Sequence, residues 1–254
     1  MKKLKILVCN DDGIDSPGIF ALVNAIKDIA DVTVVAPDRQ QSAVGHALTI
    51  MNPLRVVPFK RNGEFFGYSI NGTPADCIKI ALSGLLKEKP DLILSGINHG
   101  QNTAVNILYS GTVSAASEAY LSGYNAIAFS LASHDYDSDF STAEYYVKKI
   151  VSDLIENNVT PSYLLNVNIP YSSIREIKGI KVVPHSDTIW KDKFERRHDP
   201  FNREYYWFAG EYKVINHDPN TDDKALQENY VTITPLKLDL NDSEKIKEFS
   251  FLSK

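Results

Sequence analysis

The sequence contains little cysteine and no long apolar run. Cys9 and Cys77 are its two cysteines in 254 residues, and we expect both to be buried, reduced thiols rather than a disulfide. Nowhere do about 18 consecutive apolar residues occur, so no membrane span is predicted. The charged start, residues 1–5, precedes only a strand's length of apolar residues and no small-residue cleavage site, which is not typical of a signal peptide. We therefore expect a soluble, cytoplasmic protein without a membrane partner.

The sequence also lacks a strong charge of either sign. Its 27 basic and 32 acidic residues give a net charge of −5. No basic stripe is present, so stable binding to nucleic acid is not expected. The densest basic spot, Arg196-Arg197, is predicted to lie in a solvated loop. With 43% hydrophobic and 23% charged residues, the composition is typical of a globular protein, and the length suits one large α/β domain.

Short apolar runs alternate with helical patterns over the first two thirds of the chain. Amphipathic or capped segments predict helices that begin at Pro17, Thr73-Pro74, Thr112 and residue 140. Such alternation predicts a doubly wound, mostly parallel, Rossmann-like α/β sheet. A β-rich excursion is expected over residues 49–59 and 64–70, with Asn62-Gly63 as a hairpin signal. The strands expected in the sheet are residues 5–10, 31–36, 91–94, 126–131 and 164–169.

The pattern changes beyond about residue 175. Strands are predicted at residues 181–184, 205–208 and 231–235, but the sequence between them is loop-rich and aromatic. Such a segment cannot easily bury itself alone, so we expect a β-hairpin arm or a subunit contact there rather than a second domain. The chain, residues 1–254, is thus predicted to be a single domain whose residues 175–254 include a hairpin arm and a C-terminal segment.

Polar residues cluster at the predicted carboxyl ends of strands, where open α/β sheets bind ligands. Asp11 and Asp12 follow the first strand, Ser42 lies in the loop after the second, and Asn98 follows residues 91–94. Adjacent carboxylates repel each other unless a cation or a proton separates them. Oxygen ligands favour Mg²⁺ or Mn²⁺ over zinc. Helix capping before Pro17 is the alternative interpretation of the acidic pair.

A second polar group precedes the helix predicted to begin near Thr112. The small residues Ser110 and Gly111 leave backbone N–H groups free to bind an anion, and the Ser110 and Thr112 hydroxyls could donate to phosphate oxygens. An ordinary helix cap is the alternative here too. A divalent cation and a phosphate position on one sheet edge together indicate metal-assisted phosphoester hydrolysis. His46 and His99 lie in or beside the same loops, and either could protonate a leaving alkoxide.

Other nucleotide- or phosphate-handling folds fit the sequence less well. In a receiver-like signalling module, which also binds Mg²⁺ at an acidic pair, the phosphate-accepting Asp would stand where Gly96 stands. A dinucleotide-binding oxidoreductase would need G-x-G-x-x-G in the first turn, and carboxylates there would repel pyrophosphate. A haloacid-dehalogenase-type phosphatase would need Asp-x-Asp, which Asp11, Asp12 and Asp15 do not supply. The receiver is the principal alternative.

Five motifs in order resemble those of the SurE family, and weaker matches continue through residues 166–170, 206–207 and 232–236. The five lie within the first 115 residues, and the resemblance spans nearly the whole chain. They are residues 10–18 (NDDGIDSPG), 36–42 (APDRQQS), 72–77 (GTPADC), 95–102 (SGINHGQN) and 109–113 (YSGTV).

This resemblance implies a metal-dependent 5′/3′-nucleotidase that releases phosphate from nucleoside monophosphates, with activity on short polyphosphate. The family's metal ligands fall on Asp11, Asp12, Ser42 and Asn98, of which Asp11, Asp12 and Asn98 are the expected catalytic residues. A water activated by Mg²⁺ or Mn²⁺ is expected to attack phosphorus, because both carboxylates are committed to the cation. The resemblance also implies a homodimer or homotetramer assembled through the later hairpin and C-terminal segments. The family's phosphate-binding residues fall on Asn102, Ser110, Gly111 and Thr112.

Overall fold

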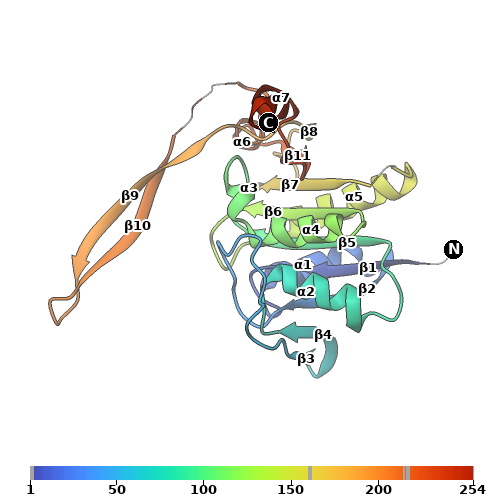
Figure 1. The fold of residues 1–254 in the computed structure, drawn as a ribbon. Coiled ribbons are helices and arrows are strands. Elements are labelled where there is room, and N and C mark those ends of the chain that lie inside the picture. The colour runs from blue at the N-terminus through green and yellow to red at the C-terminus, as the bar shows by residue number, and fades with distance from the viewer. Residues whose placement is uncertain (1–2, 160–161, 214, 216–217, 254) are drawn as a thin grey trace.

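A computed structural model describes residues 3–159, 162–213, 215 and 218–253. Nine strands of this part of the chain form one mixed sheet (Figure 1). In order across the sheet they are β3 (Val56–Arg61), β4 (Glu64–Ile70), β2 (Ala30–Pro37), β1 (Leu4–Cys9), β5 (Leu92–His99), β6 (Ala126–Ala132), β7 (Leu164–Pro170), β11 (Val231–Pro235) and β8 (Ile180–Val182).

The strands from β4 to β7 in this order run parallel, and β3 and β11 are antiparallel to the neighbours β4 and β7. The predicted doubly wound, mostly parallel sheet is therefore confirmed. The central strands are buried on both faces, which explains why they appear in the sequence as apolar runs instead of alternating patterns.

Helices cover both faces of the sheet. The helices α1 (Pro17–Ile26) and α5 (Ser141–Glu156) pack on one face, in a core with Phe129 and Val167. On the other face, α2 (Pro74–Ile80) and α4 (Gly111–Leu121) pack over a core that contains the free, buried Cys9 and Cys77. None of the helices in the described residues is long and apolar enough to cross a membrane.

Strand β5 is longer than predicted and changes the position of two site residues. Instead of ending at Leu94, it continues to His99, with a register shift against β6 between Ser95 and Asn98. Gly96 permits this path, because its φ is +130° and a side chain there would meet the Phe129 carbonyl oxygen at 2.3 Å. Asn98 and His99 therefore lie on the end of a strand, whereas the sequence predicted a loop.

The predicted hairpin arm is present, and it is more regular than expected. Strands β9 (Ile189–His198) and β10 (Glu204–Lys213) pair antiparallel and project away from the main sheet (Figure 1). Arg196 and Arg197 are exposed, as predicted, but lie in β9 and not in a loop. The remaining helices are α3 (Asn106–Tyr109), α6 (Asp222–Gln227) and α7 (Ser243–Glu248), with a π-helical turn at Ala81–Leu85 and a 3₁₀ turn at Phe249–Ser253.

Candidate active site

The acidic pair lies at the switch point of the sheet, where β1 is flanked by β2 and β5. Directly after β1, the chain turns sharply before α1. The side-chain amide of Asn10 closes this turn by donating to the Gly13 carbonyl at 2.9 Å and to the Ser16 hydroxyl at 2.8 Å. Local hydrogen bonds therefore fix the backbone that carries Asp11 and Asp12.

A cavity of about 640 Å³ opens beside this turn. Loops that follow β1, β2, β5 and β6 contribute to its walls, and so does the base of the hairpin arm. Sequence-predicted site residues that come from four separate motifs meet there. These lining residues are Asp11, Ser42, Asn98, His99, Asn102 and Ser110.

Asp11 and Asp12 are buried, with 3% and 7% of their surface exposed. Burial, and next the charge of Asp12, raise the pKa of Asp11 to about 7, and hydrogen bonding from Thr112 opposes that rise. A compensating positive charge beside Asp11 would favour its ionised form at neutral pH. Neither carboxylate caps α1, whose N-cap is Ser16, so the helix-cap interpretation of the pair is not supported.

Asn98 and Ser42, which line the same cavity as Asp11, carry neutral oxygen atoms. Asn98 uses both protons of its side-chain amide on backbone carbonyls, those of His99 at 3.0 Å and Gly100 at 2.8 Å, which leaves its Oδ1 as the atom for a ligand. The Ser42 hydroxyl accepts from Gln40 Nε2 at 2.9 Å. Among the residues that the structure describes, no three His, Cys, Asp or Glu side chains form a metal cluster. The side chains of Asp11, Asp12, Ser42 and Asn98 would offer a cation oxygen atoms alone, which fits a hard divalent cation.

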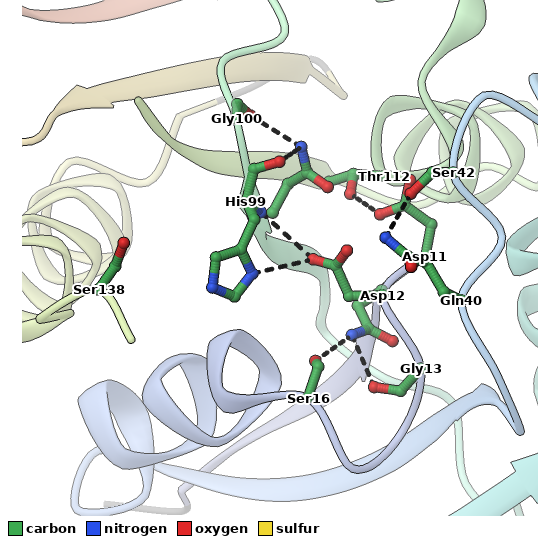
Figure 2. A network of polar contacts seen from close by, with 12 residues as sticks. Asp11, Asp12, Gly13, Ser16, Gln40, Ser42, His99, Gly100, Thr112 and Ser138 are labelled. Atoms are coloured by element: carbon green, nitrogen blue, oxygen red, sulfur yellow. Dashed lines mark hydrogen bonds and ion pairs between the residues drawn. The ribbon is translucent and has the colours of Figure 1, made fainter. Parts of the chain in front are cut away.

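The start of α4 packs directly against the acidic turn. Ser110 is the N-cap of α4, and its Oγ accepts from Val113 N at 3.1 Å. Gly111 has no side chain, and a Cβ there would lie 2.6 Å from the Cβ of Asp11. The Thr112 hydroxyl donates to Asp11 Oδ1 (Figure 2), so it already serves the carboxylate. Ser110 lines the cavity, so the N-terminus of α4 lies beside it.

Asn102 is held by side chains that the sequence did not identify as site residues. Its N–H donates to Asn168 Oδ1 at 2.7 Å, and its carbonyl accepts from Asn166 Nδ2 at 2.7 Å and Asn168 Nδ2 at 3.3 Å. Its own amide donates to Ser130 Oγ at 2.9 Å. All of these groups are buried. Asn166 and Asn168 alternate with apolar residues in β7, and two polar side chains on one face of a buried strand were the signal available in the sequence.

Two further contacts hold the same loop. Ala104 N donates to Asp222 Oδ2 at 3.0 Å, and Asp222 Oδ1 accepts from Ser186 N at 2.9 Å. Asp222 is fully buried, and burial raises its pKa. Two residues on, Asn106 Oδ1 accepts from Trp190 Nε1 at 2.8 Å. The loop residues 102 and 104, and Asn106 at the start of α3, are thus bound by side chains of β7, α6 and the arm.

His99 lies against the acidic pair. Its backbone N–H donates to Asp12 Oδ2 at 3.2 Å, and its Nδ1 is 3.5 Å from the same oxygen. The ring stacks on Tyr136, with centroids 5.3 Å apart, and meets Phe140 edge-on at 5.1 Å. Its Nε2 is buried and makes no hydrogen bond to the described residues. The ring is therefore held in place beside the cavity that it lines.

His46 has a different environment. Its Nε2 is 2.9 Å from the Glu118 carboxylate on α4, which also pairs with Lys79 at 2.7 Å. It is not among the described residues that line the cavity. The general-acid role stays a prediction for both histidines, and only His99 is close to the acidic pair.

Comparisons with known proteins show what the chain is similar to. A family model described as "Survival protein SurE" matches residues 6–192. The chain is 46% identical over 240 residues to the 5′-nucleotidase SurE of Flavobacterium johnsoniae, covering 94% of this chain and 93% of that one. It is 45% identical over 251 residues to the protein of the same name from Christiangramia forsetii, covering 98% and 96%. A crystal structure of the SurE protein from Aquifex aeolicus superposes with a TM-score of 0.85 at 38% identity, covering 98% of this chain and all of that one.

Proposed function

The chain belongs to the SurE family, and from that premise we propose that it is a divalent-metal-dependent phosphatase acting on nucleoside 5′- and 3′-monophosphates. The observation that carries the proposal is the meeting of an all-oxygen donor set with a helix N-terminus at one cavity. Neither feature alone distinguishes a phosphatase from other proteins. Together they offer a cation position and a phosphate position within one ligand's reach.

The cation is held, in this proposal, by the carboxylates of Asp11 and Asp12, the Ser42 hydroxyl and Asn98 Oδ1. The pKa of Asp11, raised by burial and by Asp12, supports this assignment, because a positive charge there relieves the repulsion of the pair. Bound Mg²⁺ or Mn²⁺ supplies Lewis acidity to a phosphoryl oxygen and lowers the pKa of a water molecule.

The phosphate is received by the start of α4. Ser110 donates its hydroxyl proton, Gly111 lets the backbone approach, and the helix N-terminus favours negative charge. The fixed loop carries Asn102 to the same cavity. Thr112 acts in this proposal through Asp11, whose carboxylate it orients by its hydrogen bond. Because these groups are fixed before substrate arrives, little reorganisation is required during the reaction.

Two extensions belong to the same proposal. Short polyphosphate presents the same terminal phosphoryl group and is proposed as a further substrate. The chain is also proposed to form a homodimer or homotetramer through the arm and the C-terminal segment, where Phe201, Trp207, Phe249 and Phe251 are exposed. The receiver-like alternative lacks support, because the position of its phosphate acceptor is occupied by Gly96.

The test is a panel of 5′- and 3′-nucleoside monophosphates and short polyphosphates, assayed for phosphate release with Mg²⁺, Mn²⁺ or EDTA. We expect hydrolysis of the monophosphates with either metal and none in EDTA. Full activity in EDTA would exclude the metal assignment. Hydrolysis of p-nitrophenyl phosphate without any hydrolysis of nucleotides would support a phosphatase activity but contradict the proposed nucleotidase activity.

A further inference from the structure

The walls of the active-site cavity are of two kinds. Asp11, Ser42, Asn98 and Ser110 supply oxygen atoms, whereas the arm supplies the aromatic rings of Trp190 and Phe208. A nucleotide likewise combines a phosphate, which needs polar partners, with a base that has two apolar faces. A cavity of about 640 Å³ exceeds what a phosphate and a cation need, so the aromatic wall has no role in the chemistry proposed so far.

Trp190 is the best-fixed aromatic residue of this wall. Its Nε1 donates to Asn106 Oδ1 at 2.8 Å, and its ring stacks on Tyr212 with centroids 4.1 Å apart and planes 31° from parallel. The Tyr212 hydroxyl is bonded in turn to the Asn106 amide. Gly210, on the paired strand, leaves room for the indole, since a Cβ there would lie 3.2 Å from Trp190 Cε3. The indole is thus oriented before any ligand binds.

The arm turns one of its two faces toward the cavity. Trp190 pairs with Tyr212 across the arm and Phe194 pairs with Phe208, so all four side chains lie on the same face. Trp190 and Phe208 from this face line the cavity. Trp207 has the opposite orientation, because neighbouring residues of a strand alternate between faces, and it is 58% exposed. The chain therefore contains a matched pair of tryptophans, one at the cavity and one away from it.

We propose that Trp190 is a specificity-determining residue on which the nucleobase of the substrate stacks. The proposal rests on the nucleotidase function proposed above and names the group that selects nucleotides over small phosphate esters. Stacking on an indole face is available to every base, so the contact favours nucleotides as a class without choosing among bases. The arm then has a role within its own subunit's active site.

The first test compares catalytic efficiency on two substrates. For each variant, kcat/KM is measured for a nucleoside 5′-monophosphate and for glycerol phosphate, which lacks a base. In Trp190→Ala we expect the ratio of the two values to fall about tenfold, mainly through KM for the nucleotide. Trp190→Phe keeps a stacking surface but loses the Nε1 hydrogen bond, and it should restore most of the ratio. Trp207→Ala should leave the ratio unchanged.

Two outcomes of this test would overturn the proposal. An unchanged ratio in Trp190→Ala would show that the base does not use the ring. A ratio that stays low in Trp190→Phe would show that the hydrogen bond to Asn106, and not stacking, is what matters.

A binding experiment separates this proposal from the nucleotidase assignment. The chain has two tryptophans, so Trp207→Phe leaves Trp190 as its single indole fluorophore. We expect adenosine to change the emission of this variant saturably, and inorganic phosphate to leave it unchanged. No response to adenosine, or the same response to phosphate alone, would overturn the stacking role. The wild type could cleave only glycerol phosphate while Trp190, in the Trp207→Phe variant, still responds to adenosine. That result would refute the proposed nucleotidase function but support a base-binding site at Trp190.

Discussion

The sheet edge that carries Asp11, Asn98 and Asn102 and the hairpin arm both contribute to one cavity, but different interactions hold them. At the edge, Asp11, Asn98 and Asn102 are buried and hydrogen-bonded to groups of the protein. On the arm, β9 and β10 pair only with each other, and Phe194 and Phe208 are each 61% exposed. Substitutions at the edge should therefore change stability and activity together. Substitutions on the arm should report on ligands or subunits with little effect on folding.

The largest effect is expected at the acidic pair. Asp12→Asn removes one of two charges from the proposed cation site, and kcat/KM for a nucleoside monophosphate should fall at least about 100-fold. Asp15→Asn is the matched control, because Asp15 lies in the same turn but is exposed, and its activity should stay near that of the wild type. Equal activities of the two variants, measured at saturating Mn²⁺, would exclude Asp12 as a ligand.

Asp11 should also lower the stability of the folded protein when no metal is bound, although the proposed function needs its carboxylate. Without metal, Asp11 has a pKa of about 7 in the folded protein against its usual 3.8. Between these values the folded state holds a proton that the unfolded chain releases. The free energy of unfolding in EDTA should therefore fall as pH rises from about 4 to about 7, and level off above that.

The variant Asp11→Asn should lack this decline and be more stable than the wild type at pH 8 in EDTA, by on the order of 2 kcal/mol. Mn²⁺ should stabilise only the wild type, by binding its folded state. Thermal denaturation at pH 5 and pH 8 measures both effects. A wild type and a variant with the same pH dependence would show that Asp11 is not the group that titrates.

A smaller effect on stability and activity is expected from a substitution of Asn168, the buried residue that holds the loop at Asn102. Asn168→Ala leaves the Asn102 N–H without its acceptor, which should cost about 1–3 kcal/mol of stability and about tenfold in kcat/KM through misplacement of Asn102. Thr232 is the matched control. Thr232 lies in β11, opposite Asn168 of β7, and is equally buried, but its Oγ1 has no hydrogen-bond partner among the described residues. Thr232→Val should be nearly neutral, and an equal loss in both variants would contradict the specific role of Asn168.

The smallest effect on folding is expected at the tip of the arm. Phe201 is 79% exposed, and Phe201→Ser should change the free energy of unfolding by no more than about 0.5 kcal/mol. The same substitution removes apolar surface from the proposed assembly interface. Sedimentation equilibrium should therefore detect a shift to smaller species. An unchanged mass together with unchanged stability would place the interface elsewhere on the chain.

The sequence predicted the main sheet better than the arm, for a physical reason. Residues 64–70 and 231–235 have their predicted bounds as β4 and β11. Strand β11 is largely buried and therefore carries an apolar signal. Strand β9 was missed because both faces of a projecting ribbon meet solvent. Charged residues and Phe194 are therefore mixed there without an apolar face.

The same limit applies to the site. Asp11, Ser42 and Asn98 could be predicted to meet because each lies near the carboxyl end of a strand, or in the loop that follows it, and these ends meet at one edge. Asp222 could not, because its contact with Ala104 joins residues 118 positions apart and no local pattern marks it. Trp190 was missed likewise, since its position depends on the pairing of an arm that the sequence did not resolve. The sequence therefore identified cavity residues whose positions follow from the sheet, and it missed residues whose positions depend on tertiary contacts.

The hydrogen bonds that hold residues 102, 104 and 106 to other parts of the protein should restrict the local opening of this segment. Loops of irregular structure usually exchange their amide hydrogens with solvent quickly, because their N–H groups point to water. Here the amides of Asn102 and Ala104 are donated to the buried side chains of Asn168 and Asp222. They should exchange as slowly as the amides of the central strands. The segment that carries Asn102 and Ala104 is in this respect part of the rigid body of the protein, although it has the backbone of a loop.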